Sequence, residues 1–201
     1  LPVVRGEIPV FVHANEIRQI EAAIYWGDRQ NIDIIIVGGK DAWRNTKLLL
    51  EKDIPIIYTQ TYSTPMRRFE NFDQSFVTPK HLLDAGIRFC ISNSESPFQT
   101  PHIRNLPYYA AKAASYGLPW DQALRSITLS TAEILGIDDR VGSLDIGKDA
   151  TLFLTDGDIL EIQTQVLSAY IQGKKVDLND RHKMLYNKYK QKYIQKSLIK
   201  D

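Results

Sequence analysis

The stretch that decides the fold is Ile32-Asp33-Ile34-Ile35-Ile36-Val37-Gly38-Gly39, a short apolar run that ends in two glycines. From Ile34 to Val37 its apolar residues are consecutive and do not alternate with polar ones, which is typical of a strand buried on both faces of a parallel sheet. Runs of the same kind occur at residues 8–12, 54–58 and 87–91. The sequence therefore predicts four parallel strands.

Between these runs the spacing of the apolar residues changes to that of a helix. Ile17, Ile20 and Ile24 recur at helical spacing after the first run, and Trp43 and Leu50 mark a second helix after the next one. A strand, a helix and another strand in succession form a βαβ unit, whose crossover is right-handed by default. The first half of the chain is thus predicted to be an α/β layer.

The remainder is predicted to be helical at first and then a small antiparallel sheet. Helices are expected at residues 106–116 and 120–127, and a short one from the capping box Ser130-Thr131-Ala132-Glu133 to Gly136. From residue 141 onward, short strands alternate with tight turns, which favours an antiparallel β module. A last helix is expected over residues 179–196.

The charge of the chain is unevenly distributed. The 201 residues carry a net charge of +1, but residues 181–200 hold seven basic residues and no acidic one, so the rest carries −6. In the basic segment Leu185, Tyr189 and Tyr193 recur at helical spacing. We interpret them as a stripe that packs the last helix on the body. Because the body is acidic, no nucleic-acid partner is predicted.

Several features exclude other classes of protein or leave them open. The apolar runs are far shorter than the roughly 18 residues that cross a bilayer, so no membrane span is predicted.

Cys90 lies inside an apolar run and is expected in the core. A single cysteine is compatible with a cytoplasmic or a periplasmic location. Because Leu1 is not a methionine, we expect the chain to begin inside a longer polypeptide.

Five strings resemble the C-terminal half of the amidohydrolase superfamily, most closely its imidazolonepropionase-like members. They are Phe11-Val12-His13-Ala14-Asn15, Gly86-Ile87-Arg88-Phe89, Gly117-Leu118-Pro119 before Ala123-Leu124, Ile127-Thr128 before Ala132-Glu133-Ile134-Leu135-Gly136, and Val141-Gly142-Ser143-Leu144-Asp145-Ile146-Gly147-Lys148-Asp149-Ala150. The last string is the most specific, and the basic final helix lies outside the resemblance.

The resemblance implies an α/β fold with half of a TIM-like (β/α)8 barrel, strands 5–8. Residues 1–138 would form this half, residues 139–178 the strands of a composite β-sandwich domain, and residues 179–201 the basic C-terminal helix. Half a barrel leaves unpaired backbone groups at both edges of its sheet. We therefore expect an N-terminal half from the same polypeptide, a partner chain, or self-association into a homo-oligomer.

The resemblance further implies a hydrolase that acts on non-peptide carbon–nitrogen bonds, such as those of cyclic or linear amides. Members of the family hold divalent metal, for which zinc is expected here, and His13 stands where the strand-5 ligand belongs. No His follows the second run, and the resemblance places Asn93 or a neighbouring Ser, in Ser92-Asn93-Ser94, where the family has its catalytic Asp. An amide is a poorer metal ligand than a carboxylate and is no general base near neutral pH.

Two hypotheses therefore remain open at the level of function. In the first, the chain is the C-terminal portion of a hydrolase, inactive by itself and metal-dependent only if the N-terminal half supplies ligands. In the second, it belongs to a non-catalytic relative that binds a small molecule at the barrel mouth. His13 is then a hydrogen-bonded residue of the mouth and not a ligand.

Charged and polar side chains after the strands are the remaining site candidates. Loops that follow parallel strands build the ligand sites of α/β proteins. We expect substrate contacts from five of their residues, each of which has a solvated loop charge as its alternative interpretation: Lys40, Asp41, Arg67, Glu95 and His102.

Overall fold

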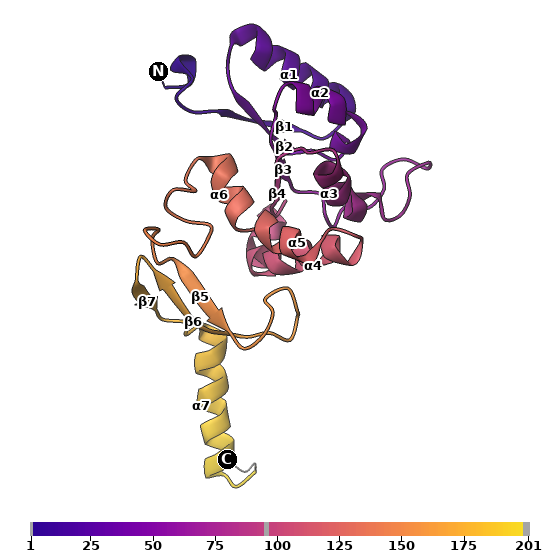
Figure 1. The fold of residues 1–201 in the computed structure, drawn as a ribbon. Helices are drawn as coiled ribbons and strands as arrows, with labels where there is room; N and C mark the ends of the chain where they lie inside the picture. The colour runs from indigo at the N-terminus through magenta and orange to yellow at the C-terminus, as the bar shows by residue number, and fades with distance from the viewer. Residues whose placement is uncertain (1, 95–96, 199–201) are drawn as a thin grey trace.

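The computed structural model describes residues 2–94 and 97–198, which form two separate sheets (Figure 1). The first sheet is parallel, has four strands and the order β1-β2-β3-β4. The second is antiparallel, has three strands and the order β5-β6-β7. The predicted parallel sheet and antiparallel module are both confirmed.

The strands of the parallel sheet overlap the four apolar runs. Their bounds are β1 Val10–Ala14, β2 Ile34–Gly38, β3 Ile56–Tyr58 and β4 Phe89–Ile91. The strands are adjacent in chain order, and His13 lies opposite Val37, Val37 opposite Ile57, and Ile57 opposite Cys90. Within the described residues, β1 and β4 each have a neighbouring strand on one side only.

Helices follow the strands in the predicted alternation. Their bounds are η1 Val3–Arg5, α1 Ile17–Gln30, η2 Ala42–Arg44, α2 Thr46–Glu51, α3 Gln74–Asp84, η3 Pro97–Asn105, α4 Leu106–Ser115, α5 Trp120–Ser126, α6 Leu129–Leu135 and α7 Arg181–Gln195. The single helix expected around Trp43 is divided into η2 and α2.

The predicted capping box of α6 is wrong. The helix begins at Leu129, its N-cap is Thr128, and no side chain caps it. Ser130 lies inside the helix, where its hydroxyl accepts a hydrogen bond of 2.6 Å from Arg125, and Arg125 also pairs with Glu133. The two residues expected to cap the backbone are thus both engaged with the neighbouring helix α5.

Both faces of the parallel sheet contribute to the core. On one face Ile34 and Ile36 of β2 pack with Ile20 of α1 and Leu49 of α2, all at most 3 % exposed. On the other face Ile35, Cys90 and Ile134 of α6 form a second cluster. Strand β2 is therefore buried on both sides, which explains why its apolar residues do not alternate. The expected burial of Cys90 is confirmed.

The antiparallel sheet is much less covered than the parallel one. Its strands are β5 Leu152–Thr155, β6 Val166–Ile171 and β7 Lys174–Val176, and none of their residues is buried. The loop between β5 and β6 joins the sheet to the body: Leu160 is buried in the main core, and Trp120 of α5 donates a hydrogen bond to Asp158.

The last helix, α7, projects away from the rest of the molecule (Figure 1). Asp180 caps it by accepting a hydrogen bond from the Lys183 amide, and none of its described residues is buried. The expected docking of Leu185, Tyr189 and Tyr193 is wrong, because these side chains are 39 %, 48 % and 45 % exposed. None of the described helices is long and apolar enough to cross a lipid bilayer.

The parallel sheet predicts where a truncation will be most costly. Ile36 is completely buried between β2 and the helices, so Ile36→Ala should lower the free energy of unfolding by about 2–5 kcal/mol. Ile146 is fully exposed, and Ile146→Ala should change it by less than about 0.5 kcal/mol. Urea unfolding followed by tryptophan fluorescence measures both values. Equal losses in the two variants would contradict this placement of the core.

Candidate functional site

The candidate site is the edge of the parallel sheet at which the four strands end. The segments that follow the strands are residues 15–16, 39–45, 59–73 and 92–105, of which the third and fourth are the longest. In a parallel sheet all carboxyl ends meet at the same edge, where α/β proteins bind their ligands. Side chains from four loops can therefore gather there.

An ion-pair network centred on Asp41 connects three of these segments. Arg67 binds both oxygens of the buried Asp41 carboxylate at 2.8 Å, and its Nη1 also contacts Glu70 Oε1 at 2.7 Å. The second oxygen of Asp41 also accepts a hydrogen bond from the backbone amide of Ile17, the first residue of α1. One carboxylate thus holds together the segments that follow β1, β2 and β3.

The network shifts the ionisation of its members. Burial opposes the ionised form of Asp41, but the hydrogen bonds from Arg67 and the Ile17 amide outweigh it, so the pKa of Asp41 is below its ordinary value. Burial also disfavours the ionised form of Glu70, and the hydrogen bonds from the Met66 amide and Arg67 again lower the pKa. Both carboxylates are therefore charged at neutral pH.

Lys40 adds a second link between the segments that follow β2 and β3. Its ammonium group donates a hydrogen bond of 2.7 Å to the backbone carbonyl of Thr64 in the loop after β3. Partial burial lowers its pKa from the ordinary value. Of the five residues predicted to contact substrate, the structure thus brings Lys40, Asp41 and Arg67 together and uses their polar groups to join loops to each other.

The structure describes only one of the other two candidates for substrate contact. His102 is exposed on η3, and Glu95 lies outside the described residues. No local pattern in the sequence indicates Glu70, because its role depends on Arg67 turning inward toward Asp41, 26 residues away in the chain.

His13 lies near the carboxyl end of β1, as predicted. Val10 and Val12 pack against the helix side of the sheet, so the exposed side chain of His13 points to the opposite face. The described part of the chain contains no group of three His, Cys, Asp or Glu residues that could hold a metal ion. By themselves, the described residues therefore do not fit a metal centre.

Asn93, two residues beyond β4, is the most unusual polar side chain at this edge. Its Oδ1 and Nδ2 atoms are both buried, and neither has a hydrogen-bond partner within the described structure. Asn15 Oδ1 after β1 and Thr61 Oγ1 after β3 are in the same state. A buried polar atom without a partner costs about 1–3 kcal/mol, so hydrogen bonding is incomplete at these positions among the described residues. The sequence pointed to Asn93 but not to Asn15 or Thr61.

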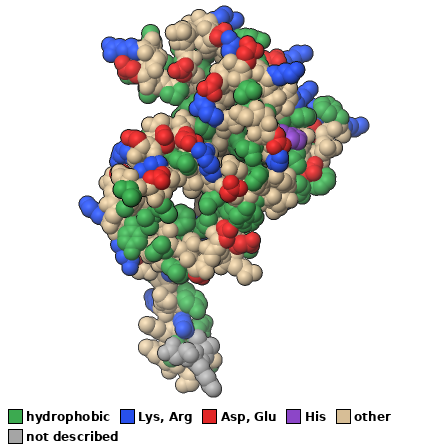
Figure 2. Space-filling model, in the orientation of Figure 1, with side chains coloured by type: hydrophobic (Ala, Val, Ile, Leu, Met, Phe, Trp, Pro, Cys, Tyr) green, Lys and Arg blue, Asp and Glu red, His purple; other side chains and the backbone are tan. Residues whose placement is uncertain are grey.

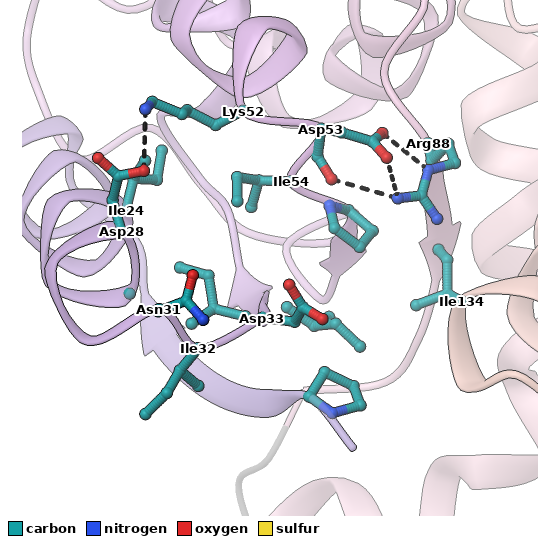
Figure 3. Close-up of a pocket in the computed structure, with 15 residues that line it drawn as sticks. Ile24, Asp28, Asn31, Ile32, Asp33, Lys52, Asp53, Ile54, Arg88 and Ile134 are labelled. Atoms are coloured by element: carbon teal, nitrogen blue, oxygen red, sulfur yellow. Dashed lines mark hydrogen bonds and ion pairs between the residues drawn. The ribbon is translucent and has the colours of Figure 1, made fainter. Parts of the chain in front are cut away.

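A hollow of about 460 Å³ lies at the opposite edge of the sheet, where β2, β3 and β4 begin (Figure 3). Ion pairs on its wall join Lys52 to Asp28 at 2.9 Å and Arg88 to Asp53 at 2.8 Å. None of the predicted site residues lines it. Its charged groups largely neutralise one another, and we do not assign the candidate site to it.

The fold and the site define a class: an α/β protein with a parallel sheet whose unsatisfied polar groups lie at the carboxyl edge. Residues 82–181 match the sequence model of the amidohydrolase family. The chain is 38% identical over 94 residues to the amidohydrolase tasK of Hapsidospora irregularis, covering 47% of this chain and 9% of that protein. It is 32% identical over 92 residues to imidazolonepropionase of Shewanella baltica (strain OS185), covering 46% of this chain and 21% of that protein.

The similarity extends to solved structures. An amidohydrolase from Thermotoga maritima superposes with a TM-score of 0.78 at 30% identity, covering 88% of this chain and 45% of that one. The resemblance to the amidohydrolase superfamily, and to its imidazolonepropionases, is therefore confirmed. The chain spans less than a quarter of the curated relatives named above and less than half of the Thermotoga structure.

The Asp41 network predicts a pH-dependent contribution to stability. Because the pKa of Asp41 is lowered by folding, its carboxylate stabilises the fold above about pH 3.9, and this contribution is lost as the pH falls through the lowered pKa. Asp41→Asn should therefore lower the urea midpoint at pH 7, and the difference from the unaltered protein should shrink below about pH 4.

The matched control is Asp53→Asn. Asp53 is in an exposed pair with Arg88 and has a left-handed backbone, which asparagine tolerates. The urea midpoint of Asp53→Asn should stay close to that of the unaltered protein at pH 7 and below about pH 4. An Asp41→Asn midpoint that is unchanged at pH 7 would contradict the role given to the network.

Proposed function

We propose that the chain is the C-terminal portion of an amidohydrolase-type hydrolase that acts on non-peptide carbon–nitrogen bonds of cyclic or linear amides. The observation that carries the proposal is the buried, unpaired amide of Asn93 at the carboxyl edge of the sheet. The family match supports the reaction class, and the position of the amide supports the class of ligand.

The chemistry of Asn93 is suited to an amide ligand. Its Nδ2 group donates hydrogen bonds and its Oδ1 atom accepts them. An amide substrate offers the complementary pair, a carbonyl acceptor and an N–H donor. Because both atoms of Asn93 are already removed from water, a ligand that pairs with them restores hydrogen bonds at little further desolvation cost. In this role Asn93 binds and orients the substrate.

The same observation limits what Asn93 can do. Its amide cannot serve as the general base that a carboxylate at this position would provide. His13 is the one candidate metal ligand in this proposal, and the remaining ligands would have to come from outside the described residues. Zinc accepts imidazole and carboxylate ligands in sites with an open position for a reactant, so we expect zinc only in a protein that supplies them.

The proposal includes the division of the chain. Residues 1–138 would be strands 5–8 of a TIM-like barrel with their helices, residues 139–178 part of a composite β-sandwich, and residues 179–201 a basic terminal helix. Two observations support this: the outer strands β1 and β4 each have one neighbour among the described strands, and the chain covers 45% of the Thermotoga amidohydrolase. An N-terminal half would then pair with both outer strands.

The presence of Asn93 also favours a second candidate function. A relative that had lost the carboxylate and the metal could keep the polar mouth and bind a small amide without hydrolysing it. Metal content separates the two candidates, because only the hydrolase requires zinc. The polypeptide for this test is the natural one that carries residues 1–201, isolated at its full length.

His13 gives the first test. If the hydrolase proposal holds, His13→Ala in the natural polypeptide should reduce bound zinc and the hydrolysis of a cyclic amide at least tenfold. His182→Ala, at an exposed position of α7, should leave both unchanged. Elemental analysis and a hydrolysis assay measure the two quantities. Zinc content that is unaffected by His13→Ala would refute the ligand assignment, and a metal-free natural protein would favour the binding function.

Asn93 gives a second, independent test. Asn93→Asp introduces a carboxylate, which is a better metal ligand than an amide, and should raise zinc affinity about tenfold or more in a competition titration with a chelator. Asn93→Ala should weaken binding of a small amide by roughly tenfold, because hydrogen bonds to the ligand are lost. If both variants behave like the unaltered protein, Asn93 does not belong to the site.

A further inference from the structure

Helix α7 combines an exposed apolar stripe with a high density of positive charge. Figure 2 shows hydrophobic and basic side chains side by side on this helix, at the bottom of the view. The apolar stripe consists of Leu185, Tyr186, Tyr189 and Tyr193, all of them exposed. Residues 181–198 carry six basic side chains and no acidic one. The helix is therefore both amphipathic and strongly cationic.

Two rows of basic residues flank the apolar stripe, one on each side. At 3.6 residues per turn, each row lies roughly 80–100° around the helix from the centre of the stripe. The first row is Arg181, Lys188, Lys192 and Lys196, and the second is Lys183 and Lys190. The opposite face carries only neutral side chains: Met184, Asn187, Gln191, Ile194 and Gln195. A surface that meets the stripe therefore meets both basic rows as well.

The described part of the chain gives α7 little support. None of the residues of this 15-residue helix is buried, and a helix of that length without packing is marginal in water. Lysines one turn apart, such as Lys188, Lys192 and Lys196, repel one another and destabilise the helix further. The Asp180 side chain caps only the first turn. A partner that covers the stripe and supplies negative charge would remove both sources of instability.

The order of side chains around α7 distinguishes a lipid surface from a nucleic acid. A helix that reads DNA presents side chains such as Arg, Asn or Gln to the polar edges of the bases. In α7 the space between the basic rows is instead filled by Leu185 and three tyrosines, and the amides lie on the far side. Tyrosine is enriched at the level where the headgroups of a bilayer meet its apolar core. The stripe is thus suited to a lipid surface.

The kind of basic residue favours the same partner. Five of the six basic residues between 181 and 198 are lysines. The planar fork of arginine matches individual carboxylates and phosphates, whereas lysine is a point charge on a flexible stem. Such stems can lie along an apolar boundary while their ammonium groups reach scattered negative charges. Clusters of four to eight basic residues on an amphipathic helix are typical of binding to anionic lipid headgroups.

We propose that α7 lies on an anionic lipid surface, with the apolar stripe turned toward the bilayer and the two basic rows on the lipid phosphates. The contact is peripheral and requires no helix that crosses the bilayer. Because each lysine near such a surface strengthens partitioning by about fivefold, the rows together supply most of the affinity. This binding is separate from the proposed hydrolase activity, since α7 contributes no residue to the candidate site.

Vesicle binding tests the proposal in the natural polypeptide that carries residues 1–201. It should sediment with vesicles of phosphatidylcholine containing about 30 % phosphatidylglycerol, and raising NaCl from about 50 to about 500 mM should release it. Lys188→Gln/Lys192→Gln should weaken the binding at least tenfold. Tyr189→Ser/Tyr193→Ser should weaken it about fivefold or more, because the apolar contact is lost.

The matched control is Arg18→Gln/Arg29→Gln, which removes the same amount of charge at exposed positions of α1, far from α7 (Figure 1). The control should bind vesicles like the unaltered protein, and circular dichroism should confirm that all variants are folded. Because the measurement contains neither zinc nor substrate, its outcome is independent of the proposed hydrolase.

Four results would overturn the proposal. A protein that stays in solution with the anionic vesicles does not bind lipid through α7. Equal binding to pure phosphatidylcholine would show that the basic rows have no part in the contact. Binding that both α7 variants leave unchanged would place the lipid contact elsewhere. A DNA duplex that binds the protein more tightly than the anionic vesicles, and loses that affinity in Lys188→Gln/Lys192→Gln, would assign α7 to nucleic acid.

Discussion

The hydrogen bonding of the parallel sheet is the constraint on which the rest of the structure depends. Four short strands lie side by side in chain order, so each inner strand is hydrogen-bonded to a neighbouring strand on both sides. The outer strands β1 and β4 have one neighbouring strand each among the described residues. Unpaired strand edges bind further strands readily. The proposed division of the chain, and the roles proposed for His13 on β1 and Asn93 after β4, all depend on further strands at these edges.

At the carboxyl edge of the parallel sheet, ion pairs of Asp41 hold the loops in place. Asp41 joins the start of α1 to the loop after β3 through Arg67, so the loops that surround the mouth are fixed before any ligand arrives. Among the charged residues that look like substrate contacts in the sequence, Asp41 and Arg67 are therefore engaged with each other, and Lys40 with the Thr64 carbonyl. The unsatisfied atoms are those of neutral side chains, Asn93 above all. This arrangement is the basis of the proposal that the site binds a polar, uncharged group such as an amide.

The sequence predicted the elements of the fold better than it predicted the contacts between them. Consecutive apolar residues located all four parallel strands. In β2 and β4, burial on both faces removes the alternation that a half-exposed strand shows, whereas β1 leaves Phe11 and His13 exposed. The capping box at Ser130 failed because Arg125 of the preceding helix binds its hydroxyl. The docking of Tyr189 failed because amphipathic spacing does not specify a partner surface. The pairing of Arg67 with Asp41 joins residues far apart in the chain and could not be seen in any local pattern.

The most direct test of this account is amide hydrogen exchange along β1, measured by mass spectrometry in the 201-residue chain and in the natural polypeptide that carries it. If further strands complete the sheet, the amides of Val10–Ala14 that face the open edge should exchange rapidly in the 201-residue chain and become protected in the natural protein. Buried β2 should be protected in both. Equally rapid exchange of β1 in the two samples would contradict the account, because the edge would then remain unpaired and no barrel would be formed.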